Sequence, residues 1–195
     1  MLQRLSEWFG KPRLPSGYRP GATLALVQRN LVGLSFEPLE GGARGRFSIP
    51  AAELSFEVVE RTHSELLMHL VVSDFLLQVP ALGRGAVALD IRHCGAFTRT
   101  GLVCKRRQGD GDVLAALEQR LLGDEALCQA LMPLDFKRLS IRLVGEEWQV
   151  SLEHMAASEV VNRVPSFRRY IRLSEGQRDC LIASLVALQR ILRTC

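Results

Sequence analysis

The sequence predicts an α+β fold with two antiparallel β units that resemble each other, helices on one face and a long C-terminal helix. Three observations predict it. Runs rich in β-branched residues fill the first half, helical periodicity appears after residue 112 and again at the end, and one stretch resembles a later one. With 195 residues, 47% of them apolar, the chain can bury a substantial core.

Residues 1–21 are expected to form a short helix and a linker, because Pro and Gly are frequent at 11–21. The apolar side chains of residues 1–9 could contact a membrane surface. We favour docking on the protein itself, since so short a segment buries little area. Residues 22–195 are expected to form a single α+β domain, with internal repeats at 22–107 and 108–195.

The first half predicts one helix and several strands. The helix is expected at 22–31, between Pro20 and Gly33. Strands are expected where β-branched and apolar residues cluster between turn residues. They flank a Gly-rich turn at 41–45 and then cover 54–62, 64–72, 74–79, 85–93 and 97–107. Pro80 is expected to end a strand because it has no N–H to donate.

The second half predicts three helices and two strands. Asp112 is expected to cap a helix at 113–122, and Asp124 to cap a shorter helix that Pro133 ends. Strands are expected at 138–144 and 148–154. Ser174 and Gln177 have capping-box spacing, and leucines recur every three or four residues as far as Leu192. A helix of about five turns is therefore expected at the C-terminal end.

A shift of 85 residues aligns residues 54–84 with residues 139–169 without a gap. The segments HLVVSDFLLQVPALGR and HMAASEVVNRVPSFRR then share His, Ser, Val-Pro and Arg. Strands predicted separately also coincide, which favours a duplication. If the two units face each other, the cleft between them is the expected place for a ligand.

The candidate ligand-binding residues are the titratable groups that this alignment pairs, with one neighbouring arginine: His69, Asp74, Arg84, His154, Glu159, Arg168 and Arg169. No catalytic residue is predicted. Residues four apart on a strand lie about 13 Å apart, too far for a local Ser-His-acid set, and G-x-S-x-G is absent. We prefer the interpretation that the serines and acids end the strand by bonding local backbone N–H groups and that Val-Pro makes a bend.

Three functional hypotheses follow. The leading one is a module that binds a small acidic or amphipathic ligand, or a partner protein, because arginines recur at matching positions. The second is an enzyme whose His, acid and Arg groups assemble between the two β units. The third is a purely protein–protein or structural module, which predicts an exposed apolar patch. A homodimer through the last helix is a minor variant.

The charge pattern indicates which classes of binding partner are expected. The formal net charge is +4, and only three of the 25 basic residues are Lys. This Arg bias fits a GC-rich bacterial genome, and Arg suits carboxylate and phosphate ligands. The arginines are scattered and only 6% of the residues are aromatic, which disfavours nucleic acid.

The sequence has five Cys residues but no C-x-x-C motif, and it also lacks the zinc-binding motif H-E-x-x-H. We therefore expect neither a metal site nor another cofactor. An odd number of Cys favours a reducing compartment, and we expect the cytoplasm. No apolar run reaches the ~18 residues that a membrane span requires.

Overall fold

The computed structural model describes residues 17–64, 68–95, 98–162 and 167–195. The predictions for residues 1–16, and the match of Pro80 with Pro165, lie outside these ranges. The strands are β1 (Ser35–Pro38), β2 (Arg44–Ile49), β3 (Leu54–Ser64), β4 (Met68–Cys94), β5 (Gly101–Gln108), β6 (Phe136–Asn162) and β7 (Phe167–Ile171). The helices are α1 (Ala22–Asn30), α2 (Gly111–Gly123), α3 (Glu125–Leu131) and α4 (Glu175–Leu192), with a short 3-10 turn at Pro50–Ala52.

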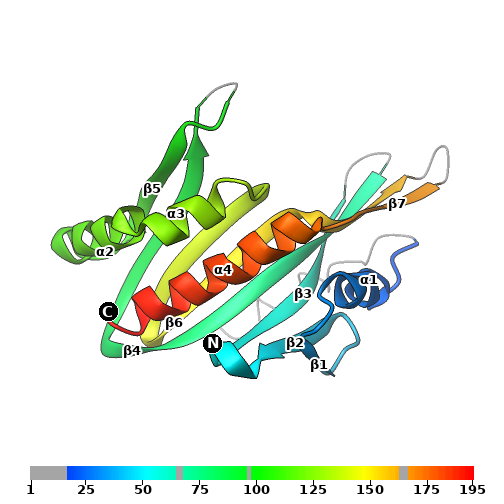
Figure 1. The fold of residues 1–195 in the computed structure, drawn as a ribbon, viewed down its shortest axis with the longest axis horizontal. Coiled ribbons are helices and arrows are strands. Elements are labelled where there is room, and N and C mark those ends of the chain that lie inside the picture. Colours follow the sequence, from blue (N-terminus) through cyan, green and yellow to red (C-terminus); the bar gives the residue numbers. More distant parts are fainter. Residues whose placement is uncertain (1–16, 65–67, 96–97, 163–166) are drawn as a thin grey trace, which may run out of the picture.

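The described strands form one curled antiparallel sheet (Figure 1). Their order is β1-β2-β3-β4-β6-β7, and β5 pairs with the far half of β4. Long helix α4 lies along one face of the sheet, and its buried leucines join the core beneath it. The predicted α+β class, the antiparallel sheet and the long C-terminal helix are therefore confirmed.

Strands β4 and β6 are much longer than predicted. The separate strands expected at 64–72, 74–79 and 85–93 fall largely in β4, and those at 138–144 and 148–154 both belong to β6. The prediction that Pro80 ends a strand is wrong. Pro80 still lies opposite Glu147, and the ladder resumes where Gly85 pairs with Gly145.

A turn in the paired strands explains why the ladder survives. Residues 81–84 of β4 face the single residue Glu146 of β6. Here β4 changes direction sharply (Figure 1), and it follows the outside of the turn that β6 makes at Gly145. The outer path is longer and needs the extra residues. Gly145 has φ +67°, a conformation that glycine adopts without a steric penalty.

A second bulge lies further along the same pair. Ser73 pairs with His154 and Val71 with Glu159, so residues 155–158 face Val72 alone. The Ser73 hydroxyl donates to the Ala157 carbonyl at 2.5 Å, and the Ser158 hydroxyl donates to the Met155 carbonyl. Both aligned serines therefore bond backbone carbonyl oxygens rather than the local N–H groups that our interpretation expected, and both lie inside continuous strands.

Two of the predicted helix caps are present in the structure, and the third lies at a different residue. Ser174 and Gln177 form the predicted capping box of α4, and Asp124 caps α3. The prediction that Asp112 caps α2 is wrong. Asp110 has extended backbone and accepts from the N–H groups of Asp112 and Val113, whereas Asp112 lies inside the first turn. None of the helices in the described ranges has the length and apolar content to cross a bilayer.

The strand pairing leaves the duplication unconfirmed. Strand β3 pairs with β4 as an antiparallel hairpin. The equivalent residues at offset 85, 139–149, belong to the same strand as the residues that follow them, and they pair with β4.

Candidate functional site

The two faces of the sheet differ in character. Side chains alternate between faces along a strand, so Phe75, Leu77 and Val79 are buried in the core while Asp74, Leu76 and Gln78 point the other way. Strand β6 continues this polar face with two rows of alternate residues, which are Arg138, Ser140 and Arg142, and Gln149, Ser151 and Glu153. The polar face therefore carries arginines next to amides and hydroxyls.

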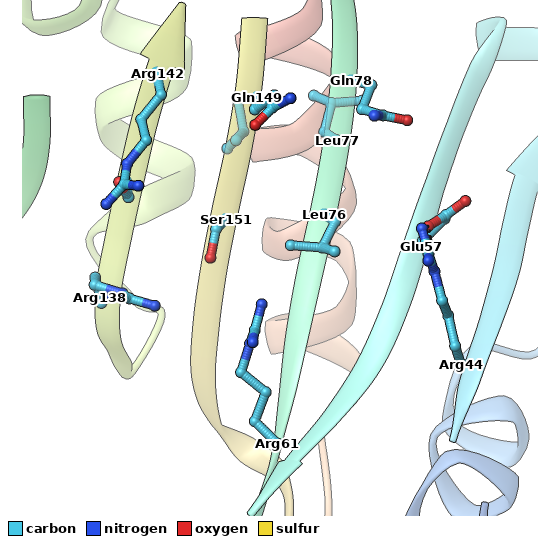
Figure 2. Close-up of a pocket in the computed structure, with 12 residues that line it drawn as sticks. Arg44, Glu57, Arg61, Leu76, Leu77, Gln78, Arg138, Arg142, Gln149 and Ser151 are labelled. Carbon is cyan, nitrogen blue, oxygen red and sulfur yellow. Dashed lines mark hydrogen bonds and ion pairs between the residues drawn. The ribbon is translucent and has the colours of Figure 1, made fainter. Parts of the chain in front are cut away.

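A groove of about 360 Å³ opens on this face. We call it the arginine groove. It is lined by Arg44, Glu57, Arg61, Leu76, Leu77, Gln78, Arg138, Ser140, Arg142, Gln149, Val150 and Ser151. Figure 2 shows Arg138 and Arg142 on one half of β6, Ser151 and Gln149 on the other, and Arg61 reaching toward Ser151 from β3.

Buried carboxylates hold two of these arginines. Arg61 donates from Nε to Asp74 at 2.6 Å, and Ser151 donates to the other oxygen of Asp74 at 2.8 Å. Arg138 bonds Glu153 at 2.6 Å. The side chain of Asp74 is fully buried and that of Glu153 is 6% exposed, while both arginines are nearly half exposed. Each pair therefore fixes a guanidinium whose outer edge faces water.

Arg142 differs from its neighbours. Among the described residues its guanidinium has no hydrogen bond or ion pair. Ser140, two residues before it on the same face of β6, is 4% exposed, and its hydroxyl has no hydrogen-bond partner in the described part of the chain. Arg44 lies at the far side and shares Glu57 with Arg46, which also pairs with Glu37, so the charges there are balanced.

A second hollow of about 620 Å³ continues from the groove. We call it the adjoining cavity. It shares Arg138 and Arg142 with the arginine groove and also includes Asp90 and Arg107. Arg107 donates to Asp90 from Nε at 2.7 Å, and the Asp90 side chain is 7% exposed. The adjoining cavity thus repeats the arrangement of a buried acid beneath a half-exposed arginine.

Comparison with protein families identifies the family of this chain. The family model for a protein of unknown function (DUF3156) matches residues 29–192. The chain belongs to this family. The matched range includes every residue that lines the arginine groove. No curated protein and no solved structure matches the DUF3156 chain.

The structure does not bring the predicted site residues of this DUF3156 chain together in one place. Asp74 is the one that borders the arginine groove, where it anchors Arg61. Glu159 and Arg168 form an ion pair at 3.3 Å beside α1, and Glu159 also accepts from Thr23 at 3.3 Å. Arg84 bonds Glu146 at the turn, and Arg169 lies opposite Val160 on β7.

The two predicted histidines are fully buried. His69 lies opposite Val161, and His154 lies opposite Ser73. His154 donates from Nδ1 to the Ala156 carbonyl and accepts at Nε2 from the Asp135 N–H, both at 3.2 Å. Burial lowers the pKa of His154, although the bond to Ala156 opposes that shift. Neither histidine lines the arginine groove or the adjoining cavity.

Sequence reasoning missed the residues that line the groove. The available signal was the alternation Arg-Leu-Ser-Ile-Arg at 138–142, which puts two arginines and a hydroxyl on one face of a strand. The sequence could not show that the other half of β6, with Gln149 and Ser151, lies across the groove from this row. Within the described ranges, no three His, Cys, Asp or Glu side chains come together as a metal site.

Proposed function

We propose that this protein binds a small anionic ligand, with carboxylate or phosphate groups, in the arginine groove. One observation supports the proposal above the others. Arg142 lines the groove with a guanidinium that has no carboxylate partner in the described structure, whereas Arg61 and Arg138 in the same groove each have one. An anion is the ligand that such a guanidinium binds most strongly.

The surrounding groups favour the same ligand. Arg61 uses Nε on Asp74 and Arg138 uses one terminal nitrogen on Glu153, so their other N–H donors are available to a ligand. Both guanidinium groups are already held by buried acids, which reduces the entropy lost when a ligand binds. The Ser140 hydroxyl lies buried in the wall between Arg138 and Arg142 without a hydrogen-bond partner in the described part of the chain.

The residues involved differ from those we predicted, while the ligand class is the same. Of the predicted residues, Asp74 has a role in this proposal as the anchor of Arg61. All five cysteines are unpaired, which supports a reducing compartment such as the cytoplasm as the place where the ligand is met.

A thermal-shift screen tests the proposal. Phosphate, succinate and citrate are added at constant ionic strength, with sodium chloride as the reference. A ligand at one hundred times its Kd stabilises the folded state by about 2.7 kcal/mol, which raises Tm by about 5–10 °C in a chain of this size. Arg142→Gln should remove most of that rise.

Arg178→Gln is the matched control, because it removes the same charge from α4, where Arg178 contacts Asp179. It should respond to the anions like the unmodified protein. The proposal fails if none of the three anions raises Tm, or if the two variants lose the response equally.

A further inference from the structure

We infer that the ligand of the arginine groove is a linear polyanion, with two or more linked phosphate or carboxylate groups, that extends from Arg142 to Arg107. This inference rests on the proposed function and adds the class of ligand. It begins from the two hollows described above, which share Arg138 and Arg142. A ligand seated on Arg142 therefore has room to continue into the adjoining cavity.

The strand register gives the separation of the two arginines. Arg142 lies opposite Ala88 in β4, and Ala88 lies opposite Gln108 in β5, next to Arg107. Two strand spacings amount to about 10 Å across the sheet. Guanidinium groups anchored on strands this far apart suit two linked anionic groups better than a single small anion.

A bulge directs Arg107 toward this face. Ala88 pairs with Gln108 and Leu89 pairs with Arg106, so Arg107 has no opposite residue in β4. Bulges of this kind re-aim a side chain out of the regular alternation. The Arg107 guanidinium contacts Oδ2 of Asp90 through Nε at 2.7 Å and a terminal nitrogen at 2.5 Å, which fixes it at the edge of the adjoining cavity.

The charges on this face also favour several anionic groups. Asp90 is shared by Arg107 and Arg92, whereas at the other end Arg44 and Arg46 are balanced by Glu57 and Glu37. Asp74 and Glu153 each have an arginine partner, whereas Glu147 accepts from the side-chain amides of Gln78 and Gln149. Because Arg142 has none among the described residues, the part of the face from Arg142 to Arg107 has more arginines than carboxylates.

A length series of phosphates tests the inference. Isothermal titration calorimetry measures the Kd of phosphate, pyrophosphate and tripolyphosphate at constant ionic strength. Tripolyphosphate should bind at least about tenfold more tightly than phosphate, since each added charged contact contributes about that factor. Arg107→Gln should weaken tripolyphosphate by about tenfold and phosphate by less than about twofold.

Two further variants make the result interpretable. Arg178→Gln removes the same net charge on α4 and should leave the ratio of the two Kd values unchanged. Arg107→Gln leaves Asp90 buried without its closest partner, so the double variant Asp90→Asn/Arg107→Gln is measured in parallel. It should fold and show the same selective loss of tripolyphosphate affinity.

The inference is overturned if tripolyphosphate binds no more tightly than phosphate, or if the Arg107 variants weaken both ligands equally. Either result, together with phosphate binding that Arg142→Gln abolishes, leaves the proposed function intact. If none of the three anions binds, both the inference and the proposed function are contradicted.

Discussion

The ion pair between Arg61 and Asp74 predicts an unequal response to removal of its two members. The Asp74 side chain is fully buried, whereas that of Arg61 is 47% exposed. Arg61→Met leaves a buried carboxylate with the Ser151 hydroxyl as its remaining side-chain donor. Removal of one partner of a buried pair costs about 3–5 kcal/mol, and we expect about 3 because water can enter where the half-exposed Arg61 was.

Asp74→Asn should cost less. It leaves a guanidinium that water already solvates, and the asparagine oxygen can still accept from Ser151. The loss is then one charge-assisted hydrogen bond, about 1.5 kcal/mol. Arg61→Met should therefore lower the free energy of unfolding about twice as much as Asp74→Asn. The double variant should cost less than the two single changes added together, since it strands no charge.

Urea unfolding followed by circular dichroism measures these differences, provided that the slope of each transition is unchanged. Arg84→Met is the matched control, because its pair with Glu146 is 80% and 63% exposed and should contribute less than about 1 kcal/mol. A larger loss in Asp74→Asn than in Arg61→Met would refute the reasoning, since it would mean that the buried carboxylate does not depend on Arg61.

Three other changes test separate parts of the account. Burial lowers the pKa of His154, so the neutral imidazole stabilises the folded state. That contribution is complete above the ordinary pKa near 6.5 and is lost as the pH falls below it. His154→Gln should therefore reduce the fall in the urea midpoint between pH 7.5 and 5. An unchanged pH dependence would assign the effect to other groups, such as the half-buried His93, whose pKa burial also lowers. Glu60→Gln should lower the unfolding free energy by about 2 kcal/mol. The reason is that the Glu60 carboxylate accepts from the Tyr18 hydroxyl and from the Gly21 and Leu24 N–H groups at the start of α1. A loss below about 0.5 kcal/mol would contradict this role. Ser174→Ala should cost about 1 kcal/mol in the same assay through loss of the capping box, and Ser174→Gly distinctly less.

The sequence predicted local structure well where local chemistry decides it. Helix α4 follows from a capping box and a leucine stripe, and both are features of neighbouring residues. The choice of cap for α2 was harder, because Asp110 and Asp112 both precede an apolar run. It depends on which residue has extended backbone, and residue order alone does not report that.

The long strands show where local signals mislead. Pro80 and Gly145 are strong turn residues, so each was expected to separate two strands. In the structure both lie in continuous strands, because β4 passes around the outside of the β6 turn and a bulge absorbs the extra residues. The pairing of segments that are distant in the sequence stabilises that arrangement, and the residues of one segment alone do not predict which segment it pairs with.

The candidate site shows the same limit. The offset-85 alignment selected residues that resemble each other in sequence, yet His69 and His154 are buried and Glu159 lies beside α1. The groove instead combines an alternating row on one half of β6 with side chains from its other half and from β3. Strand alternation could have indicated the row, but which segment faces it is set by tertiary structure.

The most direct test of an anion site in the arginine groove is the NMR signal of the Arg142 Nε–H group during a phosphate titration at constant ionic strength. Arg142→Lys assigns that signal by its disappearance. We predict a saturable shift at Arg142, a similar one at Arg138 with the same Kd, and none at Arg178 on α4. An Arg142 signal that stays in place while phosphate shifts arginines elsewhere would contradict the central claim.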